Sequence, residues 1–355
     1  MFVALRDLRA ARGRFLLITL VVTLVALLVS FLSGLTAGLA HQNISAIEAI
    51  HADALVFADN GADPAFDTSA LTEQQVDTWQ AVAGSTGTVD PIGISRAEGA
   101  VAGQGATKPA QVALFGTAGT AFGNHAATDA GTIVLSTGAA KALDAIAGDT
   151  VTLGTNTFRV ATVRGDDWYS HTPVVWMTLA DWQSVSPRGG AATVLAVSAV
   201  PDTFSVDAAA HTTSISVAGS LSALSSYRAE NGSLTLMTVL LFAISALVIG
   251  AFFTVWTVQR MPDIATLKAL GATSGALVRD ALAQATIVLT AGVAVGLGIT
   301  VAAAIFMGDT LPFVLSVSTT LLPATALIVL GLLGAAVALR FLFTTDPLTA
   351  LGAAR

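Results

Sequence analysis

Four long apolar runs without a charged side chain dominate the pattern along this 355-residue chain. About 20 apolar helical residues cross a bilayer core, so each run is long enough to cross it once. Residues 41–233, between the first and second runs, show shorter alternations of apolar and polar positions. The pattern predicts one span, a domain outside the membrane and three further spans. The runs are Phe15–Ala40, Leu234–Val258, Ala281–Met307 and Leu311–Leu339.

The last run contains Pro312 and Pro323. Because proline disfavours a helix interior, its start is interpreted as an outer turn, with the fourth span beginning at about residue 321. The predicted organisation is a cytoplasmic amphipathic N-terminus with span one (1–40), an external domain (41–233), span two (234–258), a cytoplasmic loop (259–280), span three (281–307), an outer turn (308–320), span four (321–343) and a cytoplasmic tail (344–355).

The first run has a second interpretation as a cleaved secretory signal. Four arginines precede it, and it ends in the small-residue pattern Gly38-Leu39-Ala40. The apolar core of a signal is only about 7–15 residues long, so the greater length of this run favours an uncleaved membrane helix.

Basic residues predict the orientation, since cytoplasmic loops are enriched in Lys and Arg. Segment 41–233 has seven Lys/Arg and eighteen Asp/Glu, a net charge of −11, whereas the rest has nine and five, a net charge of +4. Both termini are therefore expected in the cytoplasm of a bacterial cell, with 41–233 outside the plasma membrane. The basic residues of the inner side are Arg6, Arg9, Arg12, Arg14, Arg260, Lys268, Arg279, Arg340 and Arg355.

Composition supports a membrane protein and narrows the chemistry. Charged residues make up 11% of the chain, and the mean hydropathy is +0.75. The net charge of −7 disfavours nucleic-acid binding, and the absence of cysteine excludes disulfides, thiol nucleophiles and Cys-based metal sites.

Segment 41–233 is predicted to be an α+β domain with a mixed or mostly antiparallel sheet. A hairpin is indicated where Gly148-Asp149-Thr150 leads into one strand and Thr155-Asn156 turns into the next. The expected strands are 54–57, 132–135, 151–153, 158–163, 174–177 and 192–200, and the expected helices are 137–146, 179–185 and one from about 206.

The sequence of this domain lacks the common motifs of catalytic and metal-binding sites. No HExxH, GxSxG or Walker motif occurs, so we expect no catalytic residue, no metal and no intrinsic cofactor. Asp166 and Asp167 are interpreted as a solvated turn whose two side chains face opposite ways. The tryptophans near it, Trp168, Trp176 and Trp182, are interpreted as packing residues.

The loop at 259–280 predicts a short helix followed by a tight turn. Pro262 suits a first helical turn, Asp263 complements the helix dipole, and Gly271 is placed to end the helix. Ile264, Leu267 and Leu270 fall on one face. Ser274 is expected to cap the next helix. A plain membrane-surface helix is one interpretation of this pattern.

The segment Asp263–Ala272, with sequence DIATLKALGA, resembles the E-I-x-x-L-K-A-L-G-A signature of the MacB/FtsX superfamily of ABC transporter permeases. There this segment is the coupling helix that contacts the ATP-binding subunit. The resemblance implies that role for Pro262, Asp263, Ile264, Leu267, Lys268, Leu270 and Gly271. Asp263 stands where the family has Glu, and Pro262 is unusual at its position.

Other segments carry weaker resemblances. They are the N-terminal Ala4–Leu8, the hairpin from Gly148 to Val163 and the C-terminal Asp346–Leu351. The stretches Ser33–Leu39 and Asn43–Ile47 are most similar to the haem-exporter permeases of Gram-positive bacteria (HrtB-like) and to related cyanobacterial glycolipid exporters.

The resemblance implies an efflux permease that works as a homodimer with two ATP-binding subunits, in which ATP-Mg is bound by the partner. ATP-driven movement of the coupling helix would reach the external domain, and a haem or another amphipathic hydrophobe would leave from the membrane. Gly34 with Gly38, and Gly292 with Gly296, have the small-xxx-small spacing of close helix contacts, within one chain or between two.

If the substrate is haem, its ligands should lie near the outer ends of spans one and two, because His and Met bind haem iron and Arg pairs with carboxylates. The candidates are His41, Asn43, Glu48, Tyr227, Arg228, Glu230 and Met237, with Asn231 and Met307 beside them. Solvated interface residues and packing residues are the alternative roles for this set.

Three other hypotheses stay open. A permease of the same architecture could regulate an extracellular cell-wall hydrolase without transporting anything, as the FtsX branch does. A receptor that needs no ATPase and a membrane enzyme are the others, and no residue constellation supports the enzyme.

Overall fold

The structure, a computed structural model, describes residues 12–85, 87–102, 109–125, 127, 129–186, 190–308 and 311–339. Contacts divide the chain into a membrane unit, Met1–Gly38 with Ser233–Arg355, and an external unit, Leu39–Gly232. The N-terminal resemblance at Ala4–Leu8, the end of the predicted fourth span, the tail 344–355 and the Asp346–Leu351 motif lie outside the described residues.

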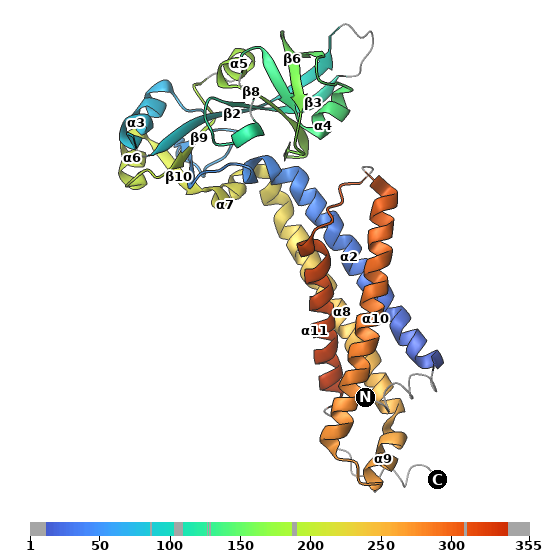
Figure 1. Ribbon diagram of the computed structural model, residues 1–355. Coiled ribbons are helices and arrows are strands. Elements are labelled where there is room, and N and C mark those ends of the chain that lie inside the picture. Colours follow the sequence, from blue (N-terminus) through green and yellow to red (C-terminus); the bar gives the residue numbers. More distant parts are fainter. Residues whose placement is uncertain are drawn as a thin grey trace. The chain divides into compact units, whose positions relative to one another are not determined.

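Four long helices form the membrane unit (Figure 1). Each is long and apolar enough to cross a membrane. A short helix, α9 (Met261–Ala269), lies at one end of the bundle. The long helices are α2 (Arg12–Glu48), α8 (Ser225–Gln259), α10 (Ser274–Met307) and α11 (Val317–Leu339). Their shared core contains residues from all four, including Val22, Ala26, Phe253, Leu289 and Leu327.

The glycines Gly292 and Gly296 of α10 form the contact with α2. A Cβ on Gly296 would lie 2.7 Å from the carbonyl oxygen of Thr23 and 2.9 Å from the Cβ of Ala26. A Cβ on Gly292 would lie 2.7 Å from a methyl group of Val22. Small residues thus let two backbones approach closely, and the partner is a helix of the same chain.

Gly34 and Gly38 of α2 have a different partner, the segment between α10 and α11. The ring of Phe313 covers Gly34 and the carbonyl of Pro312 covers Gly38, so neither position has room for a side chain. The Val314 amide also donates to the Gly34 carbonyl at 3.2 Å. The predicted outer turn therefore packs along α2 rather than standing away from it.

The fourth membrane helix begins earlier than predicted. α11 starts at Val317 rather than at about 321. Ser316 and Thr319 each accept a hydrogen bond from the other's backbone amide, so they form the reciprocal cap that starts a helix.

The external unit is built on a mixed sheet of ten strands in the described residues. The strand order is β10-β1-β9-β2-β3-β8-β4-β6-β5, and β7 pairs with β8. Pairs β3–β8 and β4–β6 are parallel and the others antiparallel. The strands are β1 (Ala54–Ala58), β2 (Thr88–Val101), β3 (Ala110–Thr117), β4 (Thr132–Leu135), β5 (Thr150–Leu153), β6 (Asn156–Val163), β7 (Trp168–Tyr169), β8 (Thr172–Thr178), β9 (Val194–Ser198) and β10 (Thr212–Ser216).

Strand β2 is long enough to serve two parts of the sheet. Its first half pairs with β9, and its end pairs with β5, so the circuit β2-β3-β8-β4-β6-β5 closes on itself. The apolar interior of this circuit holds Val112, Leu114, Leu153 and Val175, and Trp182 of α5 packs against it. A second core joins β1 and β9 to the helices α3 (Glu73–Ala83) and α6 (Thr203–Ala210), which lie together in Figure 1.

The short helices complete this unit. They are α4 (Thr137–Leu143), α5 (Leu179–Val185) and α7 (Val217–Ser220), with 3-10 turns η1 (Gly123–His125) and η2 (Leu221–Ala223). α4 stops three residues before its predicted end at 146, because Asp144 adopts a left-handed conformation. β9 covers 194–198 rather than 192–200, and α6 begins at 203 rather than about 206.

Candidate substrate and coupling sites

Two of the candidate substrate residues meet in the external unit. The Asn43 amide nitrogen donates to a carboxylate oxygen of Glu230 at 3.2 Å, and the Ser226 hydroxyl donates to the Asn43 carbonyl oxygen at 2.6 Å. Nε2 of His171 lies 3.0 Å from both Glu230 oxygens. We call Asn43, His171, Ser226 and Glu230 the Glu230 cluster. It joins the end of α2, the start of α8 and the β7–β8 turn.

His171 is held there by an unusual turn. The two residues between β7 and β8, Ser170 and His171, have φ values of 51° and 59°. A two-residue hairpin turn of this kind normally takes Asn-Gly, since side chains disfavour positive φ. The backbone amides of Ser170 and His171 donate to the carbonyls of Asn43 and Gln42, both at 2.8 Å, and α2 thereby holds the turn. The sequence alone did not indicate His171, because spacing does not show that residue 171 lies beside residue 230.

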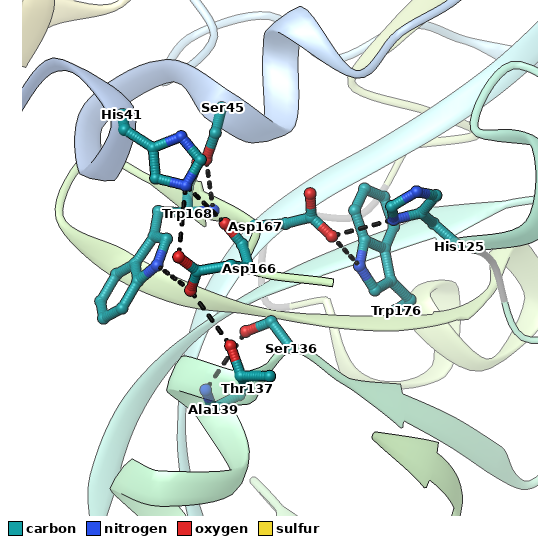
Figure 2. Close-up of polar contacts among 10 residues, drawn as sticks. All are labelled: His41, Ser45, His125, Ser136, Thr137, Ala139, Asp166, Asp167, Trp168 and Trp176. Atoms are coloured by element: carbon teal, nitrogen blue, oxygen red, sulfur yellow. Dashed lines mark hydrogen bonds and ion pairs between the residues drawn. The ribbon is translucent and has the colours of Figure 1, made fainter. Parts of the chain in front are cut away.

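Asp166 is the centre of a second polar group (Figure 2). It accepts hydrogen bonds from the Trp168 indole at 2.8 Å and from the Thr137 hydroxyl at 3.1 Å. His41 of α2 lies 3.4 Å from its other oxygen and 2.8 Å from its backbone carbonyl oxygen. The hydrogen bond from His41 is the largest cause that lowers the pKa of Asp166 to about 2, and the Asp166 side chain in turn raises the pKa of His41.

Asp167 points the opposite way, as Figure 2 shows. Its carboxylate lies 3.0 Å from Nδ1 of His125 and accepts from the buried Trp176 indole at 3.2 Å. The side chains do face opposite ways, but the interpretation as a solvated turn was wrong for Asp167, which is only 7% exposed. Adjacent residues with opposite directions enter different environments when one face is buried. Trp176 and Trp182 are buried, as expected of packing residues.

The remaining candidates do not join either group in the described residues. Tyr227 is half-buried and packs against the core of the external unit. Glu48 and Arg228 are exposed on α2 and α8. Met237 and Met307 belong to the membrane unit, and Met237 is exposed on α8. Asn231 is exposed as well.

Helix α9 and the turn that follows it contain the residues predicted for coupling to an ATPase. The helix begins after Arg260 with Pro262 in its first turn, and it ends where Gly271 adopts a φ of 96°. The amides of Gly271 and Ala272 donate to the carbonyls of Lys268 and Leu267, both at 3.0 Å, which is the Schellman arrangement. The cap of α10 is Thr273 and not Ser274, because the helix begins at Ser274 and the Thr273 hydroxyl accepts from the Ala276 amide.

One face of α9 packs against the membrane helices and the other is exposed. Ile264 contacts an apolar cluster that contains Ala281 of α10 and Leu339 of α11. Leu267 is 39% exposed and Leu270 80% exposed, so the predicted apolar face is only partly covered by this chain. A short helix with exposed leucines is suited to contact a partner or a lipid surface.

Comparison with known proteins assigns the family. Residues 15–214, more than half of the chain, match the family described as the MacB-like periplasmic core domain. Residues 235–347 match the FtsX-like permease C-terminal family. This chain belongs to the MacB/FtsX family of ABC transporter permeases. The four apolar helices and the periplasmic-type domain of this MacB/FtsX permease fit a multi-pass plasma-membrane protein with an extracytoplasmic segment.

One relative of this MacB/FtsX permease matches along its whole length and another along about half of it. The permease is 27% identical to the putative hemin transport system permease protein HrtB of Staphylococcus haemolyticus, over 99% of both chains. The protein of the same description from Staphylococcus epidermidis strain RP62A is 25% identical over 55% of this chain and 56% of its own length.

Two solved structures of transporter external regions match part of this chain with low TM-scores. The periplasmic region of MacB from Actinobacillus actinomycetemcomitans matches with a TM-score of 0.35 at 14% identity, covering 49% of this chain and 92% of that one. The extracellular domain of the ABC-type transporter YknZ from Gram-positive bacteria matches with a TM-score of 0.30 at 10% identity, covering 45% and 88%.

Proposed function

We propose that this permease is the transmembrane subunit of an exporter that moves haem, or another amphipathic hydrophobe, out of the membrane. ATP hydrolysis takes place in a separate ATP-binding subunit. The observation that carries the proposal is the end-to-end similarity to the staphylococcal protein described as a putative hemin transport permease. Residues 41–233 lie outside the cell and both termini inside, because the basic residues outside the external unit predict that side as cytoplasmic.

The substrate contacts the Glu230 cluster and the exposed residues near it in sequence. Haem offers an iron that accepts nitrogen, oxygen or sulfur ligands, and two propionates that pair with cations. His171 and Glu230 are half-exposed, so their ring and carboxylate remain partly accessible. Arg228, exposed on α8 two residues earlier, is a cation for a propionate.

The ATP-binding subunit contacts the exposed face of α9. Leu267 and Leu270 supply apolar area, and Lys268 in the last turn supplies a positive charge. Load on α9 reaches α10 and α11 through Ile264 and its cluster. The alternative of a plain membrane-surface helix predicts that α9 variants leave ATPase binding unchanged.

The working complex is a homodimer with two ATP-binding subunits in a lipid bilayer. The four glycines do not supply the dimer contact, since α2 already covers the two glycines of α10, and Pro312 and Phe313 already cover the two glycines of α2. The second copy instead contacts exposed apolar positions of α2 and α8 such as Leu24, Leu28 and Val239, which otherwise face lipid.

Reconstituted transport tests the proposal. The permease is co-expressed with the ATP-binding subunit that copurifies with it, placed in proteoliposomes loaded with haem, and supplied with ATP on the ATPase side. We expect ATP-dependent loss of haem from the vesicles and a shifted haem absorbance on the purified permease. A Glu230→Gln, His171→Gln double variant should weaken haem binding about tenfold, as expected when two ligand or hydrogen-bonding groups are removed.

The matched control is Asp77→Asn, which removes an exposed carboxylate from α3 at a distance in sequence from the cluster. It should bind haem like the unaltered chain. If no porphyrin or lipid binds and a cell-wall hydrolase copurifies instead, the regulatory function of the FtsX type replaces export. If no ATP-binding subunit copurifies and substitutions in α9 have no effect, both export and the FtsX-type regulatory function are wrong.

A further inference from the structure

A buried glutamine lies in the third membrane helix close to the α9 loop. Gln284 of α10 is 0% exposed, and its neighbours Ala281, Ala285 and Val288 are apolar. A buried amide is costly unless its hydrogen bonds are made. The Gln284 nitrogen donates to the Asp280 carboxylate at 3.0 Å, and its oxygen accepts a hydrogen bond from the Arg260 guanidinium. Both ends of the amide are therefore used.

Arg260 is the residue at which α8 becomes α9. Its amide donates to the carbonyls of Trp256 and Thr257, at 3.2 and 3.1 Å, in the last turn of α8. Its carbonyl accepts the amide of Ile264 at 3.0 Å, the first such bond of α9. The backbone of Arg260 thus belongs to both helices, and any rotation of α9 against α8 must pass through this residue.

The Arg260 side chain connects this corner to two further helices. Its guanidinium lies 5.1 Å from the centre of the Trp256 ring, and that ring packs edge-on against Phe15 of α2 at 5.9 Å. The same guanidinium reaches Gln284 of α10. Charge-assisted hydrogen bonds away from water are stronger and more directional than those at a surface.

We propose that Arg260, Gln284 and Asp280, which we call the Arg260 joint, make α9 and α10 move as one body. The three are positioning residues: they carry movement of α9 into the third membrane helix and contact neither substrate nor nucleotide. The role in transport rests on the proposed function, whereas the mechanical link itself does not. Without the joint, α9 remains attached to α10 by the apolar contacts of Ile264 and by the chain that follows it.

The chain contains no cysteine, so two introduced cysteines carry the only spin labels. Thr266→Cys on α9 and Val295→Cys on α10 place both labels at exposed positions of the membrane unit. Labelled protein is diluted with unlabelled protein so that only distances within one chain contribute. The measurement is the width of the label–label distance distribution by pulsed electron paramagnetic resonance.

We expect a single narrow distribution in the otherwise unaltered chain. Gln284→Leu and Arg260→Leu should each widen the distance distribution about twofold, because each variant removes the hydrogen bond that couples α9 to α10. The two together should widen it no further, because they break one link. Ser245→Ala is the matched control, since Ser245 is also buried but, within the part of the chain that the structure describes, bonds only to its own helix, and it should leave the width unchanged. An unchanged width in both joint variants overturns the proposal, and so does a fully additive double variant.

A double variant that exchanges the amide and the carboxylate tests whether the hydrogen bonds, rather than the volume of the Gln284 side chain, make the link. In Asp280→Asn with Gln284→Glu, the new amide donates to the new carboxylate, which still accepts from Arg260. Both hydrogen bonds and the net charge are kept, so we expect the narrow distribution to return. A swapped pair as broad as Gln284→Leu contradicts the proposal even if Gln284→Leu folds poorly.

The transport arm uses the complex with its ATP-binding subunit. Gln284→Leu should hydrolyse ATP at close to the normal rate while substrate export per ATP falls about fivefold, because load no longer reaches α10. The swapped pair should restore export. Equal loss of hydrolysis and export indicates a structural defect and counts against the joint. Failure of any ATP-binding subunit to bind contradicts the proposed function alone, since the label measurement needs no ATPase.

Discussion

The external unit and the membrane unit treat large apolar side chains in opposite ways. Trp79, Trp176 and Trp182 of the external unit are among its most deeply buried side chains. In the membrane unit Leu247 is 73% exposed, while polar Gln284 and Thr300 are buried. Lipid solvates apolar side chains, so membrane helices gain little from burying them and instead pack through small residues and internal hydrogen bonds. A type of substitution that destabilises one unit should therefore have little effect when it is made at a similar residue of the other unit.

The largest difference is expected from truncating apolar side chains. Trp176→Ala removes a buried ring that contacts Phe115 and Phe122, and it should lower the free energy of unfolding of the external unit by about 3–5 kcal/mol. Leu247→Ala on α8 should change stability very little, because lipid or detergent replaces the lost contact. Denaturant unfolding in detergent, followed by fluorescence of the remaining tryptophans, measures both. Similar losses in the two variants would remove the distinction between the units.

The next largest effect is expected from enlarging a small residue, and here the membrane unit is the sensitive one. Gly296→Leu forces a side chain into the backbone of α2 and should cost about 1–3 kcal/mol of stability. Gly298→Leu, on the same helix, enters open space and should be neutral or slightly stabilising. Thermal aggregation in detergent, read by size-exclusion chromatography, distinguishes them. Equal melting of the two variants would mean that close approach of α2 and α10 is unimportant.

A smaller effect is expected within the external unit, at two adjacent carboxylates. Asp167→Asn weakens two hydrogen bonds of a buried group and should cost about 1–3 kcal/mol. Asp166→Asn changes a largely exposed side chain and should cost less than about 1 kcal/mol. Denaturant midpoints of the two variants test the order. The opposite order would show that exposure does not govern these contacts.

The smallest effect is a pH dependence from His41 and Asp166. The raised pKa of His41 adds stability that is complete below its ordinary value of 6.5 and is lost as pH rises through the raised value. The pKa of Asp166, lowered from 3.8 to about 2, adds stability that is complete above 3.8 and is lost as pH falls toward 2.

The contact between these two side chains should therefore be strongest between about pH 4 and 6.5, and raising the pH to 8.5 should cost about 0.5 kcal/mol, because both groups are partly exposed. His41→Gln should remove this dependence, whereas His51→Gln, at an exposed histidine, should retain it. Melting temperatures of the external unit between pH 5 and 8.5 provide the measurement. A dependence that survives in His41→Gln would assign it to another group.

The hydrophobic pattern was sufficient for the architecture of one helix, an external α+β domain and three helices. The glycine at position 271 correctly predicted the turn after α9, because a residue that leaves a helix with positive φ is most often glycine. Local errors came from competing local bonds. Ser316 and Thr319 start α11 early, and Thr273 rather than Ser274 caps α10.

The candidate substrate set was predictable only as a region of the sequence. Asn43 and Glu230 are joined in the structure, but His171 completes the Glu230 cluster from a turn far away along the chain. Likewise, the resemblance predicts a coupling role for the α9 segment, yet it gave no reason to connect Arg260 with Gln284. Spacing along one helix identifies shared faces, but it does not identify the partner of a face.

The sequence by itself determined which four segments are long and apolar enough to cross a membrane and which loop resembles a coupling helix, because long apolar runs and local helix signals depend on near neighbours in the chain. Only the tertiary structure decided the partners. The glycines of α2 and α10 pack within one chain, Asp167 turns inward beside Asp166, and Arg260 reaches a buried glutamine. Such contacts depend on which surfaces of distant segments fit together, and no local pattern records that fit.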